Sequence, residues 1–328
     1  MKRGLQLIVL AIISLVVLAA CGTTNGSSDT FKIGASQIVE HPSLDRAYEG
    51  FQAALEEAGL EVEYDYQSAQ GDPNNLKPIS DGFVADDVDL IFANSTPAAL
   101  SALEATKDAR DIPIVFTSVT DAVASEIVKA MDEPGENITG VTDLHPDAIQ
   151  ETVNFIDQYF PNSSVGLIYN AGESNSVTQI EAVRAAGEGT SLSFVERTVA
   201  NSNEVQQAAT SLVSEVDVFY IVTDNTVVSA LDSVVAVANE QDIPLVVGEP
   251  DSLEKGGFVT FGIDYYTIGY RTGEMAVEIL KDGKSTKDIP VEYPPEIQLF
   301  INKGAAEEQG VEWNTEWDET AQFKETAQ

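Results

Sequence analysis

Cysteine and basic residues are scarce in this chain. One of its 328 residues is cysteine, at position 21, so no disulfide can form within a monomer and the fold must rest on a hydrophobic core. Lys and Arg number 17 against 54 Asp and Glu, which gives a formal net charge of −37. This negative field argues against nucleic acid or anionic membrane surfaces as partners. The acids are spread along the chain, which predicts a solvated acidic shell rather than an acidic docking patch.

The residue patterns of common enzymes and metal sites are also missing. The two histidines, His41 and His145, each precede a proline and have no HExxH motif or Cys/His companions, so no metal site is expected. No GxSxG motif, P-loop or strand-following GxGxxG occurs. Composition alone leaves a Ser-His-Asp triad open. We therefore expect no catalytic residues and no cofactor, and an extracellular enzyme is the least favoured of the functions considered.

The amino terminus carries an export signal. Two cations precede an apolar stretch over residues 5–20, and a flexible polar leader follows. This pattern is typical of a secretory signal peptide; a membrane-spanning helix, the alternative, usually has cationic flanks at its exit. The segment Leu18-Ala19-Ala20-Cys21 is similar to the bacterial lipobox, whose cysteine is lipidated. We expect residues 1–20 to be removed, and Cys21 to anchor a leader over 21–30 to the extracytoplasmic face of the cell membrane.

Short apolar runs recur at fairly even spacing after the leader. Most are rich in Val, Ile, Phe and Tyr and do not alternate with polar residues, which is typical of strands covered on both faces. The predicted strands are Phe31–Ala35, Val62–Tyr66, Leu90–Ala93, Ile112–Thr117, Val165–Tyr169, Leu192–Thr198, Val216–Val222, Leu245–Val247 and Phe258–Phe261.

Amphipathic segments separate these runs. Ser43 is predicted to cap a helix over 44–58, and further helices are expected over 73–85, 97–109, 146–159, 176–186, 203–213 and 227–240. Strands that alternate with helices imply right-handed crossovers and parallel sheets. The alternation runs twice and breaks near 133–144, so the sequence predicts an α/β fold of two doubly wound, Rossmann-like lobes. A helix over 265–280 and strands over 289–293 and 298–301 follow, and the pattern leaves open which lobe each joins.

Short polar residues follow four of the predicted strands. In doubly wound sheets, ligands bind beyond the carboxyl ends of the strands, where helix amino termini offer free N–H groups. Each polar residue there could instead only cap its own helix, and for a single loop the two interpretations have about equal weight. Four such loops at the same end of two lobes favour a ligand cleft. The loops cover residues 94–97, 117–121, 170–176 and 223–226.

Several segments, in order along nearly the whole mature chain, carry a family resemblance. They include the HPSLD segment over 41–45, the NSTPA segment over 94–98, the IVFTSVTD segment over 114–121, the GLIYN segment over 166–170 and the VTDN segment over 222–225. The chain resembles the ABC-transporter substrate-binding family that includes tryptophan- and tyrosine-binding lipoproteins. Its net charge is more acidic than we expect for that family.

The resemblance implies a type I periplasmic-binding fold, with the two lobes joined by a three-segment hinge and the ligand between them. The crossovers would lie near 140–142, 262–264 and 294–295. Lobe 1 would then comprise residues 31–141 and 264–293, and lobe 2 residues 142–263 and 294–328. The resemblance also implies a binding protein that delivers a small ligand to the permease and ATPase subunits of an ABC importer, and we expect it to act as a monomer.

The resemblance, together with anion-binding helix starts that are paired with one well-placed acid, implies that the ligand is an aromatic or large apolar α-amino acid. A sugar or nucleoside is the alternative ligand, and presentation of the ligand to a membrane receptor is the alternative role. Ser95, Thr96 and Thr120 are predicted to hold the carboxylate and Asp224 the ammonium, while Tyr265 and Tyr169 would face the side chain. The remaining candidate ligand-binding residues are Ser118, Asn175, Asn225 and Asp264.

Overall fold

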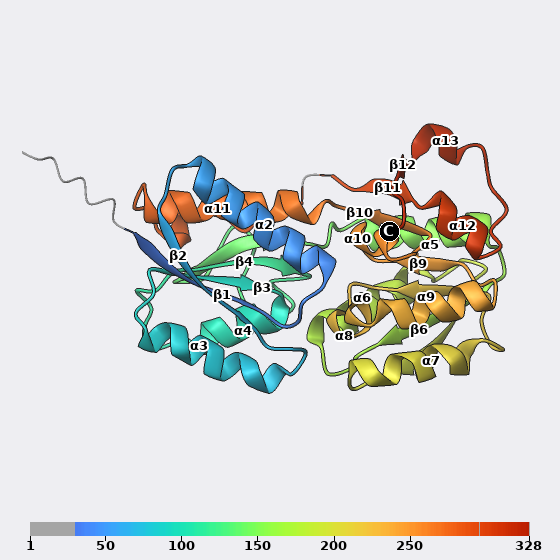
Figure 1. Cartoon of the computed structure of the whole chain (residues 1–328), viewed down its shortest axis with the longest axis horizontal. Helices are drawn as coiled ribbons and strands as arrows, with labels where there is room; N and C mark the ends of the chain where they lie inside the picture. The colour runs from blue at the N-terminus through green and yellow to red at the C-terminus, as the bar shows by residue number, and fades with distance from the viewer. Residues whose placement is uncertain (1–29, 295, 328) are drawn as a thin grey trace, which may run out of the picture. The chain divides into compact units, whose positions relative to one another are not determined.

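A computed structural model describes residues 30–294 and 296–327 (Figure 1). The signal segment and Cys21 lie outside the described residues. Two sheets organise the described chain. The first is entirely parallel and has the strand order β2-β1-β3-β4-β5. Its strands are β1 (Phe31–Gln37), β2 (Val62–Ser68), β3 (Leu90–Asn94), β4 (Ile114–Val119) and β5 (Ile138–Thr142).

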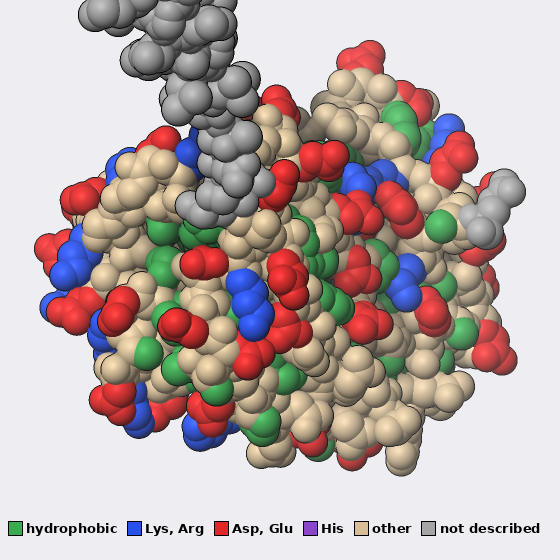
Figure 2. Space-filling model, turned by 60° about the vertical axis from the view of Figure 1, so that its left-hand side comes forward, with side chains coloured by type: hydrophobic (Ala, Val, Ile, Leu, Met, Phe, Trp, Pro, Cys, Tyr) green, Lys and Arg blue, Asp and Glu red, His purple; other side chains and the backbone are tan. Residues whose placement is uncertain are grey.

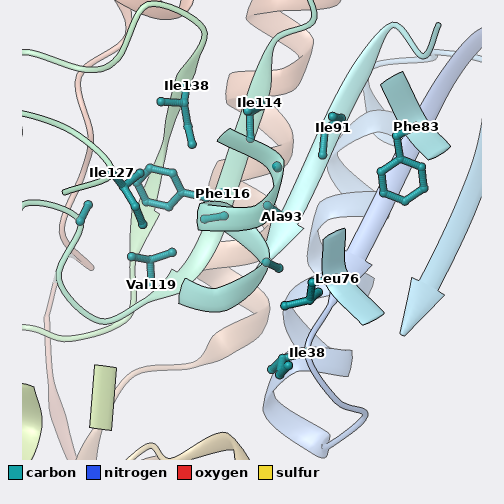
Figure 3. Close-up of a cluster of buried hydrophobic side chains, with 14 of the residues drawn as sticks. Ile38, Leu76, Phe83, Ile91, Ala93, Ile114, Phe116, Val119, Ile127 and Ile138 are labelled. Carbon is teal, nitrogen blue, oxygen red and sulfur yellow. The ribbon is translucent and has the colours of Figure 1, made fainter. Parts of the chain in front are cut away.

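Helices cover both faces of the first sheet, because successive residues of its central strands point to opposite sides. Ile91, Ile114 and Phe116 pack in one cluster with α3 (Leu76–Ala85) and α4 (Thr96–Ala105). Figure 3 shows these three side chains on the strands of the sheet. Leu90 and Val115 point the other way, toward α2 (Pro42–Glu57) and α11 (Tyr265–Leu280). The helix α11, from late in the chain, therefore completes the cover of a sheet whose strands all lie within residues 31–142.

The helices α2 and α11 touch through their backbones. A Cβ atom added to Gly269 would lie 1.8 Å from the carbonyl oxygen of Ala47, and one added to Gly50 would lie 2.1 Å from that of Tyr266. Such a close approach is open only to glycine. The two glycines therefore allow α11 to approach α2 this closely.

The second sheet has the order β12-β11-β10-β9-β8-β6-β7 and is parallel except for the pair β10–β11. One face packs on α7 (Val205–Leu212), α8 (Asn225–Ser229) and α9 (Leu231–Glu240), and the other on α5 (Ala148–Tyr159), α6 (Ser174–Ala186), α12 (Lys303–Glu308) and α13 (Trp317–Thr320). Its strands are β6 (Ser164–Tyr169), β7 (Ser193–Thr198), β8 (Val218–Ile221), β9 (Leu245–Val247), β10 (Val259–Gly262), β11 (Gln298–Ile301) and β12 (Gln322–Phe323). A short helix, α10 (Asp251–Glu254), follows β9, and the 3-10 turns are η1 (Pro73–Asn75), η2 (Ser202–Glu204) and η3 (Thr286–Asp288).

The predicted fold class is confirmed, three local predictions are wrong, and one strand was not predicted. The first helix begins at Pro42 with His41 as its N-cap, so Ser43 lies inside the first turn and does not cap it; proline is favoured at the first helical position. The helix expected over 227–240 is two helices that meet at Ala230. The strand expected over 289–293 is a single bridge between Val141 and Glu292. Strand β5 was not predicted, and it lies where the sequence pattern breaks. The residue bounds of the two lobes stay a prediction.

Acidic residues outnumber basic ones, and Figure 2 shows more Asp and Glu than Lys and Arg on the face that it presents. Many cations sit beside carboxylates, as Lys77 does 2.7 Å from Asp81. Exposed pairs of this kind contribute roughly 0–1 kcal/mol each, so they do not hold the fold together. Its stability rests on the four apolar clusters that cover the two sheets.

Candidate functional site

A small cavity lies where the carboxyl ends of strands from both sheets meet. In a parallel sheet these ends also carry the helix amino termini, which is where ligands of doubly wound folds bind. The cavity has a volume of about 10 Å³, room for roughly one water molecule, so it is nearly closed and far smaller than a small-molecule site. The first sheet and its helices contribute His41, Leu44, Ser118, Thr120, Asp143 and Tyr265, and the second contributes Asn175, Thr223, Asn225, Val228 and Glu249.

Four polar atoms of this lining are buried and have no hydrogen-bond partner in the described protein. They are Nδ1 of His41, Oγ of Ser118, Oδ1 of Asp143 and Oδ1 of Asn175. Buried polar groups in native proteins are nearly always paired, so a group of orphans around one cavity needs an explanation. A polar ligand that pairs with all four supplies it. Three of the four are acceptors, so that ligand must be rich in hydrogen-bond donors.

Asp143 is the carboxylate with a free oxygen in the cavity. Its Oδ2 accepts a hydrogen bond of 2.7 Å from the Tyr265 hydroxyl, and Thr120 also bonds the carboxylate. Burial raises the pKa of Asp143 from 3.8 to about 6, although these two bonds act in the opposite direction. The Oδ1 atom remains unpaired. A cationic group placed against Oδ1 would stabilise the ionised form.

Glu249 is the second carboxylate of the lining. Its Oε2 accepts the backbone N–H groups of Asp251 at 2.7 Å and Ser252 at 3.0 Å, and the Ser252 hydroxyl bonds Oε1. Burial, and next the neighbouring charge of Asp251, raise the pKa of Glu249 to about 7. The carboxylate of Glu249 is thus held by its own loop, whereas that of Asp143 keeps a free acceptor.

His41 and Asn225 form a third part of the wall. The amide nitrogen of Asn225 donates to Glu173, which also accepts from the backbone N–H and the hydroxyl of Thr226. Burial lowers the pKa of His41 to about 4, and a hydrogen bond with the Asn225 side chain acts against this shift. The imidazole is therefore neutral at physiological pH.

A chain of hydrogen bonds crosses the cavity from one sheet to the other. The amide nitrogen of Gln179, on α6, donates at 3.4 Å to the hydroxyl of Thr120 and at 3.3 Å to the carbonyl oxygen of Thr223. Thr120 in turn bonds Asp143, which receives the Tyr265 hydroxyl. The two lobes thus share one polar network at the site.

The lining contains no Lys or Arg. An anionic group of a ligand would therefore rest on neutral donors, such as the hydroxyls of Ser118 and Thr120. Ser118 has φ 56°, a left-handed conformation that is uncommon for residues other than glycine, and it lines the cavity from the position just before β4 ends at Val119. Strained backbone of this kind gathers at ligand sites, where the surrounding structure holds it.

Five of the ten predicted ligand residues line the cavity: Ser118, Thr120, Asn175, Asn225 and Tyr265. The other five do not. Their contact with a ligand stays a prediction, but their side chains already have protein surroundings.

Asp224 accepts the backbone N–H of Asn170 at 2.6 Å and of Val227 at 2.8 Å, where it caps α8. Ser95 caps α4, and Thr96 is buried beside it in the first turn of that helix. The remaining two lie elsewhere on the protein. Tyr169 donates its hydroxyl to Glu196, and Asp264 caps α11 and lines a separate surface pocket.

Sequence reasoning missed His41, Asp143 and Glu249. Glu249 lies two residues beyond the predicted strand Leu245–Val247, so the rule that polar residues at strand ends form ligand sites would have found it. Asp143 follows β5, which was not predicted as a strand, so no such signal was visible. His41 was weighed as a metal ligand and as a member of a catalytic triad, and it opens the HPSLD segment of the resemblance, but it was not predicted to line the ligand site. Among residues 30–294 and 296–327, no group of three or more His, Cys, Asp or Glu is placed to hold a metal ion. Within the same residues, no helix has the length and apolar character needed to cross a membrane.

Comparison with known proteins places these features in context. The family model for the ABC transporter substrate binding protein matches residues 32–322. A tyrosine-binding protein from Clostridioides difficile is 39% identical over 318 residues, which are 92% of this chain and 90% of that protein.

Two solved structures are similar over 90% of this chain. The first is an ABC domain from Streptococcus pneumonia in complex with L-Trp, which is 33% identical, is covered over 99% of its length and has a TM-score of 0.84. The second is the ligand-free, open structure of a substrate-binding protein with adhesive properties from Clostridium difficile. It is 37% identical and is covered over its full length, yet its TM-score is 0.66.

Proposed function

The chain belongs to the ABC transporter substrate-binding protein family, and we propose that its cavity binds an aromatic α-amino acid for import. Proteins of this family are extracytoplasmic and bind small solutes, which is not an enzymatic role. The observation that carries the proposed ligand is the set of four orphaned polar atoms, three of them acceptors, in a cavity without Lys or Arg. The tyrosine-binding relative and the L-Trp complex support the same ligand class.

The α-ammonium group fits the acceptors of Asp143 and Asn175. An ammonium group has three donors and a charge, and Asp143 offers a buried carboxylate with a free oxygen. Asn175 donates its amide nitrogen to the carbonyl oxygen of Thr223 and keeps Oδ1 free. Gln179 joins the two sites, since it bonds both Thr120 and the backbone of Asn175. We therefore assign the ammonium to Asp143 in place of Asp224, whose two oxygens are bonded to backbone N–H groups.

The α-carboxylate rests on hydroxyl donors in this proposal. Ser118 and Thr120 line the cavity at the end of β4, and Ser118 has an unpaired hydroxyl. The apolar part of the ligand lies against Leu44, Val228 and the ring of Tyr265, the residues of the lining with extended apolar surface. A sugar fits less well, because it offers no cation for the carboxylate of Asp143.

A thermal-shift screen tests the ligand class. Native protein comprising residues 30–328 is heated with L-amino acids, sugars and nucleosides at equal concentrations. A ligand that binds the native state alone stabilises it by about 2.7 kcal/mol at 100 times its Kd. We expect L-Tyr or L-Trp to give the largest shift. A larger shift with a sugar or nucleoside, and none with aromatic amino acids, would overturn the proposal.

The anchor and the partners complete the proposal. Cys21 carries lipid, the chain acts as a monomer, and it delivers its ligand to a permease and an ATPase rather than to a membrane receptor. The lipobox-like segment before Cys21 supports the anchor. In cells labelled with a fatty acid, Cys21→Ser should abolish labelling; a normally labelled variant would show that the anchor lies elsewhere. Uptake of labelled ligand that disappears on deletion of this protein's gene would separate transport from sensing.

A further inference from the structure

We infer that Nδ1 of His41 accepts a hydrogen bond from the ring O–H or N–H of the aromatic ligand and thereby selects tyrosine or tryptophan over phenylalanine. This assignment rests on the proposed function and deepens it. The observation that carries it is a buried, unpaired imidazole nitrogen on a residue that lines the cavity together with the apolar side chains of Leu44 and Val228.

The position of Asn225 determines which imidazole nitrogen carries the proton. The amide nitrogen of Asn225 donates one N–H to Glu173, and we assign the carbonyl oxygen of Asn225 to the bond with the imidazole. The bond from Asn225 acts to raise the pKa of His41, as an acceptor from the ring does. Since Nδ1 has no partner, that bond uses the other nitrogen, which holds the N–H. Nδ1 of the neutral ring is then a bare acceptor.

The surroundings of His41 suit the ring of a ligand rather than its ammonium. His41, the N-cap of α2, lines the cavity together with Leu44 in the first turn of that helix. Asn225 and Val228 lie three residues apart on α8 and both line the cavity, so each helix start contributes one polar and one apolar side chain. Asp143, the charged partner assigned to the ammonium, is bonded to Tyr265 and Thr120, whereas the bonds of His41 reach Asn175 only through Asn225 and Glu173.

An unpaired acceptor of this kind discriminates between ligands. Phenylalanine would leave Nδ1 of His41 buried and without a partner, whereas the phenol of tyrosine or the indole of tryptophan would pair with it. Sites built to hydrogen-bond a ligand group reject the analogue that lacks the group more strongly than a hydrophobic pocket rejects a change in size. One lost neutral hydrogen bond corresponds to a factor on the order of 10 in affinity.

The test measures Kd for L-Tyr, L-Trp and L-Phe by calorimetry on the native protein and two variants. His41→Leu removes the acceptor, and His41→Asn keeps an amide oxygen near the position of Nδ1. His41 makes no side-chain capping bond to α2, so both variants should fold, which thermal unfolding checks. We expect the native protein to bind L-Tyr or L-Trp about 10-fold or more tightly than L-Phe. His41→Leu should bring that ratio close to one, through loss of affinity for the preferred ligand, and His41→Asn should keep part of it.

The outcomes separate this assignment from the proposed function. A ratio that His41→Leu leaves unchanged would overturn the assignment, and so would an equal loss for all three ligands, since Nδ1 would then serve the ammonium. Binding of the three ligands by the native protein with equal affinity would overturn the assignment alone. Failure of the native protein to bind any of the three would overturn the proposed function, and the assignment with it.

Discussion

Asp143 combines burial with an unpaired oxygen, and this combination couples its protonation to both stability and ligand binding. Its pKa is raised from 3.8 to about 6 in the folded protein, chiefly by burial. The folded state therefore holds the proton more tightly than the unfolded chain does. The resulting contribution to stability is fully present below pH 4 and is lost as the pH rises from about 4 to about 6.

Asp143→Asn should remove this loss of stability. In the absence of ligand we expect the variant to have a larger free energy of unfolding than the native protein at pH 7.5, by about 1–3 kcal/mol. The difference should shrink toward zero as the pH falls below 4, where Asp143 becomes protonated in both the folded and the unfolded state. Urea unfolding at a series of pH values measures it. Glu249 and Asp224 titrate in both proteins, so their contributions to the pH dependence of the free energy of unfolding cancel in the comparison. A variant less stable than the native protein at pH 7.5 would contradict the prediction.

Ligand affinity should respond to the same group with the opposite sign. An ammonium group prefers ionised Asp143, so affinity for the amino acid should fall as the pH drops below about 6, and Asp143→Asn should flatten this part of the profile. The variant should also lose about 2–5 kcal/mol of binding at pH 7.5, because a buried charge partner is removed.

Two matched variants identify the carboxylate that is responsible. Asp282→Asn changes an exposed residue and should leave calorimetric affinity unaltered. Asp224→Asn distinguishes the two assignments of the ammonium. If it weakens binding in the folded protein while Asp143→Asn does not, the assignment to Asp143 is wrong.

Residue-scale prediction from the sequence succeeded where a strand was recognised and failed where it was not. Ser118, Thr120, Asn175 and Asn225 follow predicted strands or begin the helices after them, and all four line the cavity. For Asp224 the sequence could not distinguish a carboxylate that caps its own helix from one that faces a ligand. The two roles place the same residue type at the same strand end, and only the hydrogen bonds separate them.

At the scale of elements, the contact between α2 and α11 depends on glycine. Gly269→Ala would place a Cβ atom 1.8 Å from the carbonyl oxygen of Ala47, so the helices must separate. We expect the free energy of unfolding to fall by about 1–3 kcal/mol or more, as for other overpacked sites. Urea unfolding at pH 7.5 measures the change.

Gly82→Ala is the matched control. Gly82 lies within α3 and has nothing within 4 Å of an added Cβ, so the same substitution should raise stability there by about 0.5–1 kcal/mol. If Gly269→Ala and Gly82→Ala unfold at a similar urea concentration, then α2 and α11 can move apart without a loss of stability.

The existence of α11 was readable from the sequence, whereas its place in the fold was not. Its 3.6-residue period gives the bounds Tyr265–Leu280, which the structure confirms. Periodicity says nothing about which sheet a helix covers, and only the family resemblance pointed to the first. Strand β5 was not predicted because its apolar run is short and broken. Gly140 interrupts its apolar run, yet an added Cβ there would lie 2.1 Å from the carbonyl oxygen of Phe116, so the close pairing of β5 with β4 requires glycine.

At the scale of the whole molecule, the cavity is too enclosed for a ligand to enter as it stands. Tyr265 is 2% exposed, and His41, on another wall, is 8% exposed. The two lobes must therefore part to admit a ligand. The comparisons agree with such a motion, since the L-Trp complex superposes with a TM-score of 0.84 and the open, ligand-free relative, at similar identity, with only 0.66.

Small-angle scattering tests this motion. We expect a smaller radius of gyration with saturating L-Tyr or L-Trp than without ligand, because ligand pairs with groups from both lobes. A sugar that gives no thermal shift serves as the control and should leave the radius unchanged. An equal radius with and without the bound amino acid would contradict a hinge motion.

The position of α11 also has a consequence for the order in which the protein can fold during synthesis. All five strands of the first sheet are complete by Thr142, but the helix that lies with α2 on one of its faces begins at Tyr265. During synthesis, Phe51 and Val115 therefore lack the apolar contacts of α11 until more than a hundred residues after Thr142 have been added. The second sheet meets no such delay in its central strands, since β6 to β10 and their helices follow one another directly. The first sheet is thus the first part to be synthesised and among the last to be fully covered, so it stays exposed to chaperones and proteases for longest.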